Sequence, residues 1–241
     1  MPKVRKALEP QQERSRESLR RLLKAATEVL GQHGVDGTTI PRIAHHAGLT
    51  PGAVYRRFHD KEALLEAAIL GILERQDERV KTGMSPTAAA RIPLAVLAEQ
   101  TIGGMVTVYR MNAPLLRVLR QFAQSRSKTP FYAKASRLEA RSFERIVDLF
   151  LTHRSEIRHP DPHLAVSLGL MVVVSTIVDL VVLPVDRRAW KDLIPEDDPA
   201  LKRELTRVFL SYLGVHAVTR RAGTRSGATG PARVARAGQR S

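Results

Sequence analysis

The stretch from Thr39 to Phe58 constrains the fold most, because it predicts two short helices joined by a tight turn. Thr39 is a suitable N-cap residue, and Pro41 falls in the first helical turn, where its missing N–H removes no intrahelical hydrogen bond. Gly48 follows the first helix, where the chain needs a positive φ to leave it. Thr50 then caps a second helix.

Two helices that cross steeply about a glycine turn form a helix-turn-helix, whose second helix fits the major groove of B-DNA. The same pattern also suits two amphipathic helices in an ordinary bundle, so the flanking residues decide between these interpretations. The apolar residues that we expect to be buried are Ile40, Ile43, Ala44, Ala47, Leu49, Ala53, Val54 and Phe58.

The flanks favour the helix-turn-helix. Residues Ser15 to Ala68 resemble the DNA-binding domain of the tetracycline-repressor (TetR) family of transcriptional regulators, most densely in TTIPRIAHHAGLTPGAVYRRFHDKEALL, from Thr38 to Leu65. The resemblance implies an all-α fold with an N-terminal three-helix DNA-binding domain and a C-terminal helical domain for ligand binding and dimerisation. It further implies a homodimer, a double-stranded DNA operator and a small-molecule effector that releases a repressor.

The geometry of the motif places the N-terminal half of the second helix in the groove. The residues that we expect there are Thr50, Pro51, Gly52, Tyr55 and Arg56. Arg56 can bond to guanine or pair with a phosphate, and both options remain open. Arg57 is either a phosphate contact or a solvated charge. The resemblance implies that Thr39, Arg42, Tyr55 and Lys61 touch the DNA backbone.

The net charge of +15 and pI near 10.9 favour a polyanionic partner, nucleic acid first and an anionic membrane surface second. Residues 219–241 hold six arginines and no acid, residues 1–60 hold eleven Lys or Arg against six acids, and residues 61–218 are nearly neutral. We expect the tail to be disordered and to add non-specific DNA affinity. The alternative function is therefore a sequence-tolerant nucleoid-type DNA binder driven by basic tails.

We expect four parts along the chain. They are a flexible basic arm (1–14), the DNA-binding domain with its connecting helix (15–80), the helical ligand-binding and dimerisation domain (81–218) and the basic tail (219–241). Lys3, Arg5 and Lys6 of the arm either reach DNA or are merely solvated. Outside the motif, helical spacing predicts helices over 15–32, 85–110, 113–125, 130–153, 162–183 and 199–218, with a further helix capped by Asp60. Pro93, Gly103 and Gly104 predict a kink or split within 85–110.

Residues 164–185 are apolar over a length that suits a membrane span. Asp179 lies within this stretch, which argues against a span. A helix that is apolar all round also suits a position between its own core and a partner subunit. The resemblance implies this second role, because TetR-family proteins dimerise through their last two long helices. We therefore expect no membrane partner.

The resemblance also implies a small-molecule pocket in the second domain. Candidate lining residues are Met105, Tyr109, Phe122, Phe143, Met171, Ser175, Thr176 and Asp179, although each also suits an ordinary core position. A buried Asp179 would require a partner, which could be Arg110, Arg117, a cationic ligand or a residue of the partner subunit.

The sequence contains no signal for an enzyme, a metal site or a cofactor. His45 and His46 are adjacent on a helix and point about 100° apart, and prolines interrupt the spacing of His153, His159 and His163. Glycine loops for phosphate, nucleophile elbows and paired carboxylates are lacking, and the chain has no cysteine. Residues 1–10 are polar and basic, so we expect a cytoplasmic protein.

Overall fold

The computed structural model describes residues 5–183, 186 and 189–215, with side chains from residue 12 onward. Within these residues the chain forms helices and no strands, which confirms the predicted all-α fold. The α-helices are α1 (Arg5–Gly37), α2 (Ile40–His46), α3 (Pro51–Tyr55), α4 (Lys61–Gly83), α5 (Pro86–Ala89), α6 (Leu94–Gln124), α7 (Pro130–Leu151), α8 (Pro162–Ile177) and α9 (Asp198–Tyr212). A 3₁₀ turn, η1 (Arg154–Glu156), follows α7, and a π-helical segment, η2 (Val178–Val182), continues α8.

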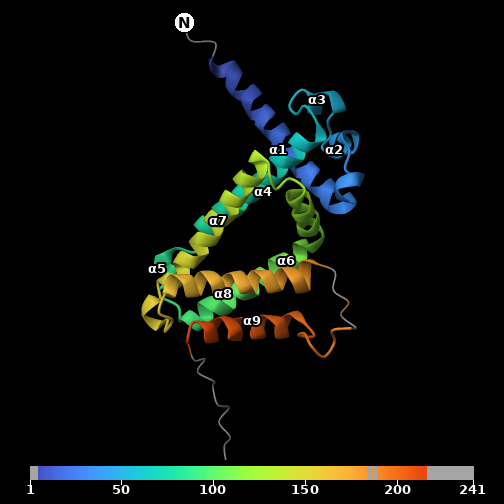
Figure 1. Cartoon of the computed structure of the whole chain (residues 1–241). Helices are drawn as coiled ribbons and strands as arrows, with labels where there is room; N and C mark the ends of the chain where they lie inside the picture. Colours follow the sequence, from blue (N-terminus) through green and yellow to red (C-terminus); the bar gives the residue numbers. More distant parts are fainter. Residues whose placement is uncertain (1–4, 184–185, 187–188, 216–241) are drawn as a thin grey trace, which may run out of the picture.

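The helices form a head and a body (Figure 1). We call α1 to α3 with the first half of α4 the head, and α5 to α9 with the rest of α4 the body. In Figure 1, α4 and α7 run side by side from the head towards α5, and α8 and α9 lie next to each other at the end of the molecule away from the head. Helix α6 packs against α9 and then turns towards α1, so it belongs to both ends of the molecule.

Two hydrophobic cores hold these helices together. The body core gathers apolar side chains of α6 to α9, with Phe150 and Phe209 in edge-to-face contact at 5.1 Å between ring centroids. The head core contains Leu22, Ile43 and Val54, and it also takes Phe122 from α6 and Phe131 from α7. The predicted boundary between residues 80 and 81 falls in the last turns of α4, whereas the head core extends to residues well beyond it.

Helices α1 and α6 are longer than predicted. Helix α1 begins at Arg5 rather than Ser15, and a positive φ of 67° at Gly34 marks the break near its expected end. The predicted split of residues 85–110 occurs just before Pro93, but Gly103 and Gly104 lie in unbroken helix. The predicted break between 110 and 113 is wrong, because α6 runs on through Pro114. The predicted basic tail (219–241) lies outside the described residues.

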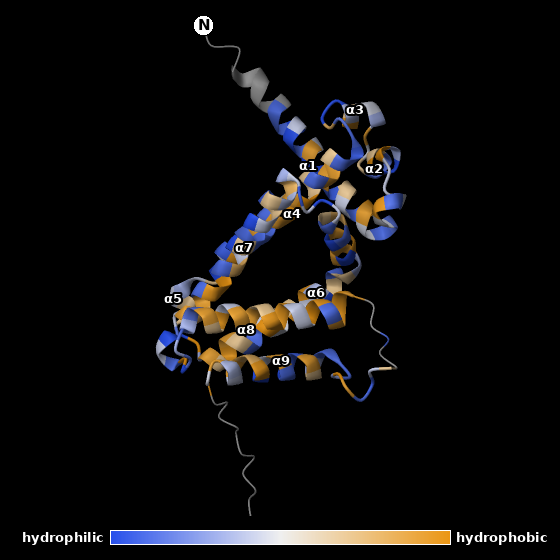
Figure 2. Cartoon of the chain, viewed as in Figure 1, coloured by the Kyte–Doolittle hydropathy of each residue, from blue (hydrophilic) through white to orange (hydrophobic). Residues whose placement is uncertain are grey.

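Helix α8 is apolar over nearly its whole length (Figure 2). Together with η2 it is the one described stretch long and apolar enough to cross a membrane, and half of that stretch is buried inside the fold. Gly169 brings α8 close to α9, since a Cβ atom there would lie 2.8 Å from Cδ2 of Phe209. The buried half of α8 therefore serves the body core.

A cluster of charged side chains joins α4 to α7. Asp77 of α4 is 7% exposed, and its Oδ1 accepts hydrogen bonds from Nε of Arg145 at 2.9 Å and from Oγ of Ser142 at 3.3 Å. Arg141 lies 3.8 Å from the second carboxylate oxygen. The hydrogen bond from Arg145 is the main reason why the pKa of Asp77 lies below its ordinary value of 3.8.

We expect this cluster to make stability depend on pH. A lowered folded-state pKa means that the contribution of Asp77 is present above the ordinary pKa and is lost as the pH falls through the folded-state value. The difference in melting temperature between wild type and Asp77→Asn should thus be largest above about pH 5 and shrink towards about pH 3. Thermal unfolding followed by circular dichroism measures it. Glu74→Gln, at an exposed α4 position, is the control and should show a small difference; a gap that stays constant for Asp77→Asn would contradict the prediction.

Candidate nucleic-acid interface

The local sequence builds the helix-turn-helix of the head through caps and one glycine. Oγ1 of Thr39 accepts the backbone N–H of Arg42 at the start of α2. Gly48 has a φ of 65°, which turns the chain, and the N–H of Leu49 then bonds back to the carbonyl of Ala44 at 2.9 Å. Leu49 is half-buried against the head core, so the turn is fixed by both hydrogen bonds and packing.

Helix α3 presents one polar face to solvent. Oγ1 of Thr50 accepts the N–H of Ala53 at 3.3 Å, and Val54 is buried in the head core. The residues predicted to enter the groove, which are Thr50, Pro51, Gly52, Tyr55 and Arg56, are all exposed. Tyr55 is 56% exposed, and a Cβ built on Gly52 has no atom within 4 Å apart from its chain neighbours and the backbone of its own helix. A flat surface such as a groove wall can therefore approach the α3 backbone closely.

Three of the predicted DNA-contacting cations bond to the protein itself. Arg57 donates to Oγ of Ser18 at 3.3 Å and to Oγ and the carbonyl of Ser15 at 3.2 and 3.3 Å. Nζ of Lys61 donates to the carbonyl of Val35 at 3.3 Å, and Arg42 donates to the carbonyl of Gly37.

Arg56 differs from these three cations. Among the described residues, its guanidinium makes no hydrogen bond or ion pair. The bonds of Arg57 to α1 are a role that the sequence did not reveal, since the serines lie about 40 positions earlier in the chain.

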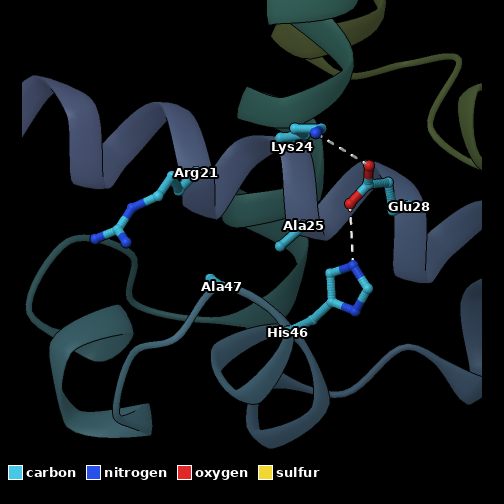
Figure 3. A pocket seen from close by; sticks show the side chains of 6 residues that line it. All are labelled: Arg21, Lys24, Ala25, Glu28, His46 and Ala47. Carbon is cyan, nitrogen blue, oxygen red and sulfur yellow. Dashed lines mark hydrogen bonds and ion pairs between the residues drawn. The ribbon is translucent and has the colours of Figure 1, made fainter.

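A small hollow of about 170 Å³ lies between α1 and α2 (Figure 3). It is lined by Arg21, Lys24, Ala25, Glu28, His46 and Ala47. Glu28 joins two of these side chains, because its carboxylate lies 3.0 Å from Nε2 of His46 and 3.6 Å from Nζ of Lys24. Arg21 points away from Glu28 (Figure 3). The contact between Glu28 and His46 joins the end of α2 to α1, whereas the pair of Lys24 and Glu28 lies within α1.

The structure does not bring the predicted pocket residues together. Met105, Tyr109 and Phe143 pack against the body core, whereas Phe122 lies in the head core. Met171, Ser175 and Asp179 are exposed, and Oγ1 of Thr176 donates to the carbonyl of Val172.

Asp179 is thus not a buried carboxylate in this chain, and its predicted partners are engaged elsewhere. Nη2 of Arg110 lies 2.6 Å from Asp198, and Arg117 donates to the carbonyl of Val182. Helical spacing alone does not distinguish the two cases, because residues exposed on one chain and residues buried in a core show the same spacing.

Tyr109 of α6 is half-buried in the body, and two exposed charged side chains, Arg120 of α6 and Glu139 of α7, lie near it. Burial raises the pKa of Tyr109, and the carboxylate of Glu139 raises it further. Burial also raises the pKa of Glu139, which the nearby Arg120 opposes. Neither Tyr109 nor Glu139 makes a hydrogen bond within the part of the chain that the structure describes. Sequence analysis missed Glu139 and Arg120, because only the packing of α6 beside α7 brings them near Tyr109.

Two of the three histidines between residues 153 and 163 bond to the protein itself. Nδ1 of His153 lies 2.7 Å from Glu156, and its Nε2 lies 3.1 Å from the carbonyl of Ala89, so this buried ring joins α5 to the end of α7. His159 bonds to the backbone of Asp161. Within the described residues, no group of three or more His, Cys, Asp or Glu side chains could hold a metal ion.

Comparison with known proteins finds regulators that resemble this chain in sequence and in fold. Residues 22–68 match the model of bacterial regulatory proteins of the tetR family. The HTH-type transcriptional regulator BetI of Brucella anthropi is 26% identical over 189 residues, which cover 70% of this chain and 93% of that protein. BetI of Cronobacter sakazakii is 26% identical over 143 residues, which cover 59% and 67% of the two chains.

Solved structures show the same fold. A TetR-family regulator from Mesorhizobium loti superposes with a TM-score of 0.61 at 22% identity, covering 83% of this chain and 97% of that one. The fatty acid degradation regulator FadR of Bacillus halodurans superposes with a TM-score of 0.55 at 16% identity, covering 80% and 97%. Residues 22–68, with the exposed face of α3, therefore form a DNA-binding helix-turn-helix of the tetR family, and the chain shares the fold of TetR-family transcriptional regulators.

Proposed function

We propose that this regulator binds a palindromic operator as a homodimer, represses transcription and leaves the DNA when a small-molecule effector binds. The observation that carries the proposal is the pairing of one exposed polar face on α3 with one exposed apolar face on α8 and α9. Because such a regulator acts on DNA inside the cell, its location is the cytoplasm. Its role is regulatory and not enzymatic.

Support for the DNA contact comes from the head. Thr50, Pro51, Gly52, Tyr55 and Arg56 form the exposed surface of α3 that faces the groove. Thr39 and Arg42 at the start of α2, with Lys61 at the start of α4, flank this surface. We assign Arg56 to direct DNA contact because its charge has no partner in the described part of the chain, and we assign Arg57 to holding α3 against α1.

Support for the homodimer comes from α8 and α9. We define the apolar stripe as Leu164, Leu168, Met171 and Val172 of α8 with Val208 and Tyr212 of α9, all exposed. The four α8 residues follow the spacing of a single helical face. Contiguous exposed apolar residues mark an interaction surface. A second copy of the chain is the natural occupant, since a palindrome requires two reading helices related by two-fold symmetry.

Support for an effector comes from the region between α6 and α7. Met105, Tyr109 and Phe143 provide an apolar surface, and Glu139 and Arg120 add charged groups beside it. A half-buried tyrosine beside an apolar surface and exposed charged groups suits a ligand site. Effector binding there would favour a dimer geometry that fits the operator poorly, and the operator would weaken effector binding in return.

The first test is selection of binding sites from random duplex DNA, with the full chain and with a chain that ends at Arg220. We expect both to enrich one palindromic motif at a fixed, near-physiological salt concentration. The rival function, a nucleoid-type binder driven by the basic tails, rests on the six arginines beyond residue 219. If the full chain retains DNA without enriching a motif, and the truncated chain no longer retains DNA, the rival function would be established instead.

If Arg57 holds α3 against α1, the effects of substituting Arg57 and Ser18 on operator binding should not add. Arg57→Ala and Ser18→Ala should each weaken operator binding, and the double variant should be little worse than Arg57→Ala, because all three remove the same bond. The slope of log affinity against log salt should stay unchanged, whereas loss of a phosphate contact lowers it by about 0.9. Fluorescence anisotropy over a salt series measures both quantities. If Arg57→Ala lowers the salt slope and its effect adds to that of Ser18→Ala, Arg57 instead contacts a phosphate.

The dimer proposal predicts that one charge in the apolar stripe separates the subunits. Val172→Lys should raise the dissociation constant of the dimer by at least about a hundredfold, since a buried unpaired charge costs several kcal/mol. Sedimentation velocity across a concentration series measures it. Val108→Lys on α6 is the matched control, because Val108 is 48% exposed and Val172 47% exposed. Equal behaviour of the two variants would place the interface elsewhere.

A further inference from the structure

Two different joints connect the head to the body. At the first joint, α4 leaves the head and runs along α7 (Figure 1). Carboxylates of α4 meet cations of the α6–α7 turn and α7 at three levels: Glu66 with Arg126 at 3.5 Å, Glu74 with Lys134 at 3.4 Å, and Asp77 with Arg145 at 2.9 Å. At the second joint, α6 packs against α1.

The Asp77 level differs from the other two in burial and in the number of its bonds. The side chain of Asp77 is 11% exposed, whereas Glu66 and Arg126 are 32% and 22% exposed and both partners of the Glu74–Lys134 pair are more than half exposed. Exposed ion pairs contribute little, because water competes for both charges. Asp77 instead receives Ser142 and Arg145 on one oxygen and faces Arg141 with the other. Three side chains of α7 thus fix the position of one carboxylate of α4.

The second joint is apolar. A Cβ built on Gly31 of α1 lies 3.6 Å from Leu115 of α6, and Val118 and Leu119 pack against the head core. Apolar contacts have no preferred direction, so they tolerate small sliding movements. Hydrogen bonds to a buried carboxylate lose much of their strength when the geometry changes by a fraction of an ångström. The joint between α4 and α7 therefore holds the two helices in one fixed position along each other, whereas the joint between α1 and α6 allows them to slide.

We propose that Asp77 is the positioning residue that fixes the head relative to α8 and α9, and so sets the distance between the two α3 helices of the dimer. Helix α7 leads through η1 directly into α8, which carries the apolar stripe. The path from the stripe to α3 then runs along α8 and α7, across Asp77 to α4, and from α4 into the head core. The proposal rests on the proposed dimeric operator binding. Movement of the head occurs at the joint between α1 and α6.

The test compares operators with different half-site spacing. Wild-type protein should bind the selected palindrome more tightly than versions with one or two base pairs inserted at its centre. Asp77→Asn keeps the size of the side chain but removes its charge, and it should reduce this discrimination by about tenfold, while affinity for an isolated half-site stays the same. A purely structural role would not change the spacing ratio selectively. Fluorescence anisotropy with the full chain measures each affinity.

Matched variants keep the result decisive. Glu74→Gln, one turn earlier on the same helix, should leave spacing discrimination unchanged. Arg145→Gln approaches the same bond from α7; it should relax discrimination as Asp77→Asn does, and the double variant should add little. It also carries the test if Asp77→Asn fails to fold, as judged by its melting temperature. Discrimination that persists in Arg145→Gln and in a folded Asp77→Asn would overturn the proposal, whereas wild type without discrimination would refute the dimeric operator itself.

Discussion

Side-chain caps at the helix starts are the interaction on which this fold depends. Oxygens of Thr39, Thr50, Asp60, Ser85, Thr129, Asp161 and Asp197 each accept the backbone N–H three residues further on. In six of these helices a proline occupies one of the first two positions. Each cap contributes about 1 kcal/mol and, more importantly here, determines where each helix begins. Because the helices α2 and α3 are only seven and five residues long, their caps also decide where the polar face of α3 points.

These caps explain why much of the fold could be predicted. A Ser, Thr or Asp with a proline one or two residues later is a local signal, and it marks the starts of α2, α3, α7 and α8 in the sequence. The predicted break between residues 110 and 113 was wrong, because α6 runs on through Pro114. Ala113 is buried and Leu115 rests on Gly31, so packing of α6 against α1 offsets the loss of one hydrogen bond. Tertiary contacts of this kind are invisible in a local pattern.

The candidate sites divide in the same way. The exposed face of α3 followed from helical spacing, since the buried positions of a short amphipathic helix define its exposed ones. The roles of Arg57 and Asp77 could not be predicted, because their partners lie 39 to 68 positions away in the chain. The pocket residues were dispersed because an aromatic or methionine at helical spacing does not specify which core it joins. Phe122 shows this well, since it lies on a body helix and yet belongs to the head core.

Because α6 contributes side chains to both hydrophobic cores, it limits how the head of this protein can be exchanged with that of a relative. The head core is completed by Phe122, Phe131 and Ala135, so a head cut after α4 would expose the apolar surface that those side chains cover. Leu97 and Val106, earlier on the same helix, are equally necessary to the body core. Head and body therefore share core residues, and a chimera that exchanges heads has to exchange the distal part of α6 and the first turns of α7 as well. In this chain the transferable module is defined by its core and not by its position along the sequence.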